Sequence, residues 1–402
     1  MRKTWWSLNK SLYLVLIPML VLLCACSSQE PSQTVTIKFS TWGSTQELSV
    51  VKNLIRQFEQ QHPHIHVDLI HIPENYFQKL HILIAGDLAP DVMFVNSLNF
   101  PIYAENNILE PLNIDSTQFF PAALKAFQWH GRLYAIPRDV SDLVVFYNKT
   151  LFKRAGISEP KSDWTLDDML KISHKLTQPG QFGFSFNAKP PFLWLPFVWS
   201  NGGDIFDANF SRFTLTQPEA IRAVQFYADL RNRWHVAPTR MEVGNATMSQ
   251  LFLQQKLAMM ISGRWSVPIL REQAGFQWDI VPFPSGKAGS VVSIDASGYA
   301  MSHAGMHKTE SWELISFLSS RQAQQQLAQS GLIVPARKDA ASLEKGNYFL
   351  KAMERGLPTH TPVRWNEINE ELTLALEPVW DGTESADQAL KTVAPKIEKL
   401  LR

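Results

Sequence analysis

The feature that most constrains the fold of this chain is an alternation of strand and helix patterns between residues 34 and 96. Three segments are rich in β-branched and apolar residues, and the two segments between them carry apolar residues at helical spacing. Their order along the chain is TVTIKFSTWG (34–43), QELSVVKNLIRQFEQQHP (46–63), IHVDLIHI (65–72), YFQKLHILIAGD (76–87) and APDVMFVN (89–96). This order predicts an α/β unit built on parallel strands.

Two of these strands end in residues suited to binding. Trp42 and Gly43 follow the first strand, and Asn96 and Ser97 stand at the end of the third. Ligands of such sheets bind beyond the carboxyl ends of the strands. We therefore expect Trp42 and Asn96 to face a ligand, the alternative for Trp42 being packing on the surface of the unit.

The rest of the chain mixes both patterns. Residues 131–156 read as a turn, an extended apolar segment and a short helix, and residues 249–265 as a helix, a short strand and a turn at Gly263. Residues 308–331 read as a long amphipathic stretch of two helices. Further helices are predicted over 164–178, opened by Thr165, and over 217–234, 367–380 and 385–401.

The N-terminus carries an export signal. Basic residues precede the uncharged run SLYLVLIPMLVLL (11–23), which is short for a membrane-spanning helix. The run ends in Leu23-Cys24-Ala25-Cys26, which resembles a bacterial lipobox. Residues 1–25 are then a lipoprotein signal peptide, Cys26 is the lipid attachment point, and residues 26–34 form a polar tether. A signal anchor and an ordinary secretory signal are the alternatives.

Composition excludes several function classes. The two cysteines both lie in the N-terminal segment, so the remainder can form no internal disulfide and needs a large apolar core. The chain has 38 basic and 37 acidic residues, and removal of Arg2, Lys3 and Lys10 leaves 35 against 37, a formal charge of −2. A nucleic-acid partner is not expected at that charge. A chain of this length usually forms two domains.

Motifs spread over nearly the whole mature chain, from about 35 to 400, resemble the family 1 extracellular solute-binding proteins of ABC importers, the class of maltose-binding protein. In order they are IKFSTWG, AGDLAPDVMFVN, GRLYAIPRDVSDLVVFYNKTLFKRAG, WTLDDML, VWSNGGDIFD, KLAMMISGRW, WDIVPFPSG and GLIVPARKD. Each motif alone is weak, whereas their shared order and spacing make the resemblance specific.

The resemblance implies an α/β, two-lobed fold of the type II periplasmic-binding-protein kind, with a ligand cleft between the lobes. Lobe 1 would comprise residues 35–140 with 299–335, and lobe 2 residues 142–297 with 337–402. The chain would cross between them near 139–143, 297–301 and 334–337. Hinge closure around a ligand is the expected motion.

The function implied is capture of a carbohydrate and its delivery to an ABC transporter permease. The protein would be a lipid-anchored monomer outside the cytoplasm, in the periplasm or on the outer cell surface. We expect no catalytic site, cofactor or metal. Of the 13 tryptophans, only Trp5 and Trp6 lie in the signal, and such an abundance favours a sugar ligand.

The predicted ligand residues combine flat aromatic faces with planar polar groups. Asp139 has a hinge ion pair with Arg138 as its alternative, and Arg337 has a lobe-linking ion pair as its alternative. Gly263 and Trp265 resemble the G-x-W segment of the family. The whole predicted set is Trp42, Asn96, Asp139, Trp199, Asn201, Gly263, Trp265, Asp295, Ser297, Arg337 and Trp365.

Other functions are open to the same sequence. A phosphorylated polyol such as glycerol-3-phosphate would need cations in the cleft, which Arg138, Arg264 and Arg337 would supply. A glycoside hydrolase would need a marked pair of carboxylates, and no pair stands out. A sensor for a membrane receptor would look the same. His64 and His66 share a strand face that would suit zinc, although an exposed polar junction explains them equally.

Overall fold

The computed structural model describes residues 34–189, 191–341, 348–349, 357–358 and 361–402. The predicted signal peptide (1–25) and the lipid attachment point Cys26 lie outside the described residues, as does the tether apart from Thr34.

The predicted strand–helix unit is confirmed at the start of the chain. β1 pairs in parallel with both β2 and β3. Ser44 caps the first helix by accepting a hydrogen bond from the Glu47 N–H, and the predicted apolar stripe of that helix is buried. The bounds are β1 Val35–Thr41, α2 Thr45–Gln61, β2 Ile65–His71, α3 Tyr76–Ala85 and β3 Val92–Asn96.

The large sheet is mixed beyond this parallel unit. Its strand order is β11-β6-β10-β3-β1-β2, and β12 pairs with β10 off this path. β10 runs antiparallel to both β3 and β6, and β11 runs antiparallel to β6. The added strands are β6 Ile136–Ser141, β10 Ser293–Met301, β11 Val334–Pro335 and β12 Leu357–Pro358.

Helices cover both faces of the large sheet. One face packs against α2, α13 and α14, and the other packs against α3 and α4. The predicted stretch 308–331 is indeed two helices, which meet at Ser320, the N-cap of the second. The bounds are α4 Phe100–Glu105, α5 Pro121–Lys125, α13 Lys308–Leu318 and α14 Arg321–Gln329, with the short pair β4 Gln128–Trp129 and β5 Arg132–Leu133 and the 3-10 turn η1 Ser116–Gln118 beside them.

A second body surrounds a three-stranded antiparallel sheet in the order β8-β7-β9. Its largest core joins this sheet to α7, α8, α9 and the C-terminal helices α16 and α17. The strands are β7 Val144–Asn148, β8 Met259–Ser262 and β9 Trp278–Pro282. The helices are α6 Lys149–Arg154, α7 Leu166–Leu176, α8 Leu195–Ser200, α9 Pro218–Asn232, α10 Arg240–Val243, α11 Met248–Leu253, α12 Val267–Gln273, α16 Trp365–Trp380 and α17 Ala386–Leu400, with the 3-10 turns η2 Pro191–Leu193 and η3 Arg264–Ser266.

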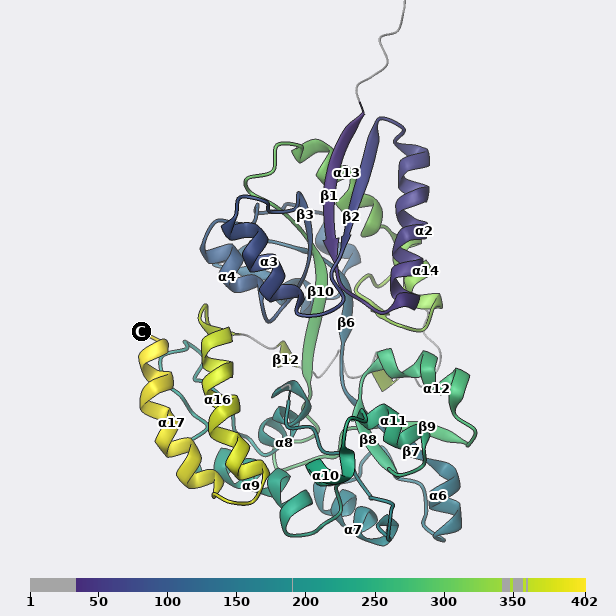
Figure 1. Cartoon of the computed structure of the whole chain (residues 1–402), viewed down its shortest axis with the longest axis vertical. Coiled ribbons are helices and arrows are strands. Elements are labelled where there is room, and N and C mark those ends of the chain that lie inside the picture. Colours follow the sequence, from purple (N-terminus) through teal and green to yellow (C-terminus); the bar gives the residue numbers. More distant parts are fainter. Residues whose placement is uncertain (1–33, 190, 342–347, 350–356, 359–360) are drawn as a thin grey trace, which may run out of the picture.

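Neighbouring strands connect the two bodies. Figure 1 shows β6 and β10 running side by side from the upper body, which holds β1 to β3, toward the lower body, which holds α16 and α17. Only Asp142 and Leu143 separate β6 from β7. The three segments predicted as crossings thus overlap β6, β10 and β11, which are consecutive in the sheet order.

Candidate ligand-binding site

Three predicted ligand residues lie in one row across neighbouring strands. Ser297 of β10 stands opposite Asn96 at the end of β3, and on its other side it stands opposite Asp139 of β6. Asp139 is in turn opposite Pro335 of β11. The sheet register therefore brings an amide, a hydroxyl and a carboxylate to one line where the strands connect the two bodies.

The carboxylate of this row is already in an ion pair. Arg138 Nε donates to Asp139 Oδ2 at 2.5 Å, and Arg138 Nη1 lies 2.8 Å from Glu47 Oε1 in the first turn of α2. The Arg138 side chain also stacks on the Phe94 ring, with Cζ 4.1 Å from its centroid. Burial disfavours the charged guanidinium, yet the charges of Asp139 and Glu47 outweigh it and raise the pKa of Arg138. We call these residues (Glu47, Arg138 and Asp139) the Arg138 group.

Trp42 is half-buried beside the same group. Its ring lies 4.1 Å from the Phe94 ring and 4.9 Å from the Tyr76 ring, measured between centroids, and Phe77 completes the cluster at 5.5 Å. The Phe94 ring thus contacts both the Arg138 guanidinium and the Trp42 indole. The aromatic cluster fixes the indole at the carboxyl end of β1, where the sequence predicts a ligand.

Trp265 is the most exposed of the predicted aromatic residues, at 40%. It lies in the turn η3 after β8, and its ring meets Phe192 edge to face at 6.3 Å. A Cβ on Gly263 would stand 2.0 Å from the Trp265 ring. Glycine at 263 therefore lets the indole lie against the backbone at that position, and a Cβ there would displace the ring. The G-x-W spacing of the sequence has this direct steric explanation.

A buried carboxylate that the sequence analysis did not select stands between the two sheets. Asp142 is 1% exposed, and neither of its carboxylate oxygens has a hydrogen-bond partner in the described structure. Burial raises the pKa of this carboxyl well above its usual range, while the charge of Arg264 opposes the shift only in part. Nearby, Asp295 is half-buried on β10 opposite Ser141.

Three other predicted residues lie in the second body. Trp199 is buried in α8 and donates through Nε1 to Asp204 at 2.8 Å, and Asn201 donates to the Phe197 carbonyl. Trp365 is 6% exposed and packs edge to face on Phe206 in the core. The burial of Trp199 and Trp365 leaves little aromatic face open at these positions.

The glycine turn beside Asn201 has a steric basis. Gly202 has φ +85°, and a Cβ on Gly203 would stand 2.9 Å from side-chain atoms of Ala220 and Val198. The helix α8 and the helix α9 approach each other at this turn, and only glycine allows that approach.

Arg337 makes a local ion pair. Its Nε and Nη2 atoms donate to the two oxygens of Asp339 at 2.9 and 2.8 Å, and its guanidinium lies over the Phe119 ring at 5.2 Å. A bidentate pair of this kind orients the arginine side chain and uses its Nε–H and one Nη2–H donor.

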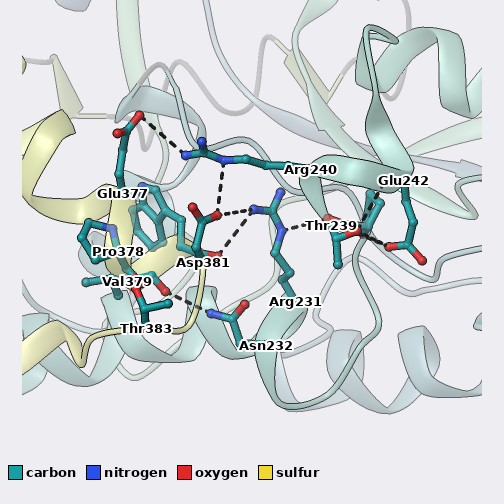
Figure 2. A network of polar contacts seen from close by, with 12 residues as sticks. Arg231, Asn232, Thr239, Arg240, Glu242, Glu377, Pro378, Val379, Asp381 and Thr383 are labelled. Atoms are coloured by element: carbon teal, nitrogen blue, oxygen red, sulfur yellow. Dashed lines mark hydrogen bonds and ion pairs between the residues drawn. The ribbon is translucent and has the colours of Figure 1, made fainter.

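A polar network on the other side of the second body holds the C-terminal helices in place (Figure 2). Buried Arg231 of α9 donates to the Pro238 carbonyl at 2.8 Å and reaches Asp381 at 3.9 Å. Arg240 lies 3.2 Å from the same Asp381 and 3.6 Å from Glu377 of α16. Figure 2 shows both guanidinium groups directed at the Asp381 carboxylate. We call Arg231, Arg240, Glu377 and Asp381 the Arg231 network.

Two histidines in or beside β2 lie within 3.0 Å of a carboxylate. His62 Nδ1 lies 3.0 Å from Glu313 Oε2, and His66 Nδ1 lies 2.9 Å from Glu59 Oε1. Across the ranges that the structure describes, no group of three or more histidine, cysteine or acidic side chains is arranged to hold a metal ion.

The described helices were also compared with the length and hydropathy that a bilayer demands. None of them combines enough length and enough apolar character to cross a membrane.

Comparisons with known proteins agree with this architecture. A structure of an ABC substrate-binding protein from Listeria monocytogenes in complex with cycloalternan is 25% identical, with a TM-score of 0.84, covering 92% of this chain and 99% of that one. A structure of UgpB from Mycobacterium tuberculosis in complex with glycerophosphocholine is 20% identical, with a TM-score of 0.79, covering 92% and 98%. The galactooligosaccharide-binding protein of Bacillus subtilis is 23% identical and covers 92% of each chain.

These likenesses identify the fold as the two-lobed, type II periplasmic-binding-protein kind. The profile of one protein family, described as bacterial extracellular solute-binding protein, matches residues 42–325. Its members bind solutes and are not enzymes. The chain belongs to the bacterial extracellular solute-binding protein family.

Proposed function

We propose that this protein captures a carbohydrate between its two lobes and delivers it to an ABC transporter permease. The observation that carries the proposal is the row of Asn96, Ser297 and Asp139 across the connecting strands, with Trp42 beside it. Half-exposed Trp265 offers a second aromatic face from the other body. We propose lobe 1 as residues 35–140 with 299–335 and lobe 2 as residues 142–297 with 337–402.

The proposed chemistry is that of a sugar ring. Its C–H faces stack on the indoles of Trp42 and Trp265, and its hydroxyls exchange hydrogen bonds with Asn96 and Ser297. Asp142 adds a buried carboxyl group whose two oxygens have no hydrogen-bond partner among the described residues. Closure of the lobes removes these groups from water together, so that bound sugar shifts the population toward the closed form.

The names of similar proteins support a saccharide. The Listeria structure holds cycloalternan, and the Bacillus relative is named for galactooligosaccharides. We therefore propose an oligosaccharide or a related sugar as the solute class.

We propose that Cys26 carries a lipid that anchors the protein outside the cytoplasm as a monomer. The support is the lipobox-like end of the signal and the polar segment that follows it. The tether would let the soluble lobes search the space near a membrane-embedded permease.

A phosphorylated or phosphodiester polyol is the second candidate solute, because one structural neighbour is in complex with glycerophosphocholine. Two of the three arginines that would suit such a solute are already held by carboxylates. Arg138 lies between Glu47 and Asp139, and Arg337 is bidentate on Asp339. This occupancy makes the neutral sugar the first candidate.

The test is thermal unfolding of purified residues 27–402 with mono-, di- and oligosaccharides, polyols and glycerophosphodiesters. A ligand of the native state stabilises it by about 2.7 kcal/mol at a hundredfold over Kd. We expect a shift with one sugar class, weakened at least about tenfold in affinity by Trp265→Ala, since buried aromatic anchors dominate binding. Trp129→Ala is the control, because Trp129 lies on β4 and bonds Glu105. A shift with phosphodiesters alone, or with no sugar, contradicts the proposal.

A further inference from the structure

A cavity opens between α12 of the second body and α14 of the first. It has a volume of about 530 Å³. Its walls come from η3, from α12, from α14 and from the chain around β11. The lining side chains on which the argument rests are Arg264, Arg271, Arg321, Gln325, Gln329 and Asp339. Figure 1 shows α12 and α14 on the same side of the connecting strands, opposite α3 and α16.

This cavity adjoins the candidate sugar site through Arg264, which stands between Gly263 and Trp265, but its arginines Arg271 and Arg321 are not among the predicted ligand residues. None of the predicted ligand residues is among its lining residues in the described structure. Arg271 instead reaches the turn after α14, where its Nη1 lies 3.9 Å from the position of a Cβ on Gly331. Pro268 of α12 stands 3.6 Å from the same position. The two bodies therefore meet at this cavity through α12 and the Gly331 turn.

The lining carries an excess of positive charge. Within the described ranges neither Arg271 nor Arg321 has a carboxylate at ion-pair distance, and both side chains are exposed. Among the described lining residues Asp339 is the only acidic one, and it is paired with Arg337. Hydrogen bonds from Arg337, with the charges of Arg337 and Arg321, lower the pKa of Asp339 and keep it ionised. Gln325 and Gln329 add neutral donors.

We propose that this cavity binds a small polyanion, a compound with two or more phosphate or carboxylate groups. Arginine forks match both groups in bidentate geometry. A volume of this size is in the range of small-molecule sites and exceeds what a single phosphate needs. Arg271 would bind one end of the anion from α12, and Arg321 the other end from α14. The anion would thus bridge the two bodies next to β11.

The inference goes beyond the proposed function and does not depend on it. The anion site uses Arg271 and Arg321, which are not predicted sugar ligands, so each ligand is measured without the other. A bridge between the bodies also predicts linkage, because an anion that favours one arrangement of the lobes changes the sugar affinity by the same factor as sugar changes the anion affinity.

The experiment is isothermal titration of residues 27–402 with inorganic pyrophosphate and, in a second arm, with citrate. Sodium chloride at matched ionic strength controls for screening. We expect saturable binding of one of the two anions. Arg271→Gln and Arg321→Gln should each weaken it about tenfold or more, since each removes charge-assisted hydrogen bonds. Arg132→Gln removes the same charge from an exposed position on β5 and should leave binding unchanged.

Each outcome decides the proposal. Binding of pyrophosphate alone names phosphate groups as the ligand chemistry, and binding of citrate alone names carboxylates. Heat no greater than in sodium chloride overturns the site. Equal weakening by Arg132→Gln reduces the effect to net charge and also overturns it. Loss in only one of Arg271→Gln and Arg321→Gln overturns the bridge. If residues 27–402 bind an anion in this titration but no sugar in the thermal unfolding test, the anion site stands and the proposed function fails.

Discussion

The Arg138 group and the Arg231 network each bury an arginine over a phenylalanine ring, at 4.1 Å on Phe94 and 3.9 Å on Phe186. They satisfy that arginine differently. Arg138 lies between two carboxylates, which raise its pKa. Arg231 donates mainly to backbone carbonyls and meets half-exposed Asp381 only at 3.9 Å, and burial lowers its pKa.

The difference separates two uses of a buried cation. Beside the candidate site, the carboxylates of Glu47 and Asp139 neutralise the Arg138 guanidinium. Removal of Arg138 would leave both carboxylates without a counter-charge. In the C-terminal helices, the guanidinium ties loop and helix ends together through neutral acceptors, and the partly exposed carboxylates around it are screened by water. The first arrangement fixes the geometry of three side chains, and the second fixes the position of helices.

The largest effect should come from Arg138→Met. The substitution leaves buried Asp139 and partly buried Glu47 without a counter-charge, so we expect a loss of about 3–5 kcal/mol in the free energy of unfolding. Urea unfolding followed by circular dichroism measures it, with exposed Arg132→Met as the matched control. A loss below about 1 kcal/mol would show that the carboxylates do not depend on the arginine. It would contradict the proposed difference between the Arg138 group and the Arg231 network.

Arg231→Met should cost less, about 1.5–3 kcal/mol, because hydrogen bonds from a charged donor are lost but no buried charge is stranded. Asp381 keeps Arg240 at 3.2 Å. The same urea titration measures this loss. If Arg231→Met lowers the free energy of unfolding as much as Arg138→Met does, backbone carbonyls stabilise a buried guanidinium as well as carboxylates do.

Asp142→Asn tests a buried carboxyl close to the Arg138 group in sequence. Unlike Asp139, Asp142 has no hydrogen bond from an arginine in the described structure. Its pKa is raised in the folded state, so the native chain holds a proton that the unfolded chain releases above about pH 4. Wild-type stability should therefore fall as the pH rises from about 4 to 8. The variant, which cannot ionise there, should gain on the order of 1 kcal/mol at the upper end.

Urea unfolding of both proteins at pH values of about 4.5, 6 and 8 measures that slope. Asp168→Asn is the control, because hydrogen bonds from Thr165 lower the pKa of this capping residue. A difference between wild type and Asp142→Asn that stays constant with pH would mean that Asp142 is ionised in the folded state throughout.

Asp381→Asn should have the smallest effect, below about 1 kcal/mol. Its carboxylate is 41% exposed, and exposed ion pairs contribute little. The free energy of unfolding at low and high salt is the measurement, and any loss should shrink with salt. A loss as large as that of Arg231→Met would place the strength of the network in its charges and not in the carbonyl bonds.

Periodicity predicted the elements of the first unit closely because each buries one face of a regular pattern. Helix α2 spans Thr45–Gln61 against a predicted 46–63, and β2 matches to one residue. The third strand begins at Val92 and not at residue 89, since Pro90 lacks the N–H that a central strand needs.

The strand β10 was predicted only as a crossing, because its sequence SIDASGYAM mixes polar residues and glycine into the apolar pattern. Gly298 has a tertiary cause that no local pattern carries, since a Cβ there would stand 2.5 Å from the Ile136 carbonyl oxygen. The antiparallel insertion of β10 between β3 and β6 is equally non-local.

The site was only partly predictable for the same reason. Asp139 was selected with an ion pair to Arg138 as the alternative, and the structure contains that pair. Its third member, Glu47, is far away in sequence, and its only local signal is a first-turn position after the Trp42-Gly43 strand end. Asp142 carries no local signal beyond its place in the sequence RDVSD, and whether the predicted residues bind a ligand stays a prediction.

The contact between Gly263 and the Trp265 ring couples the side chains that these two positions can hold. A larger residue at 263 would displace the indole by steric exclusion, so a substitution at one position changes the space available at the other. A redesign that replaces Trp265 alone would leave empty space beside Gly263, where the indole now lies. A library aimed at a new solute should therefore vary positions 263 and 265 together.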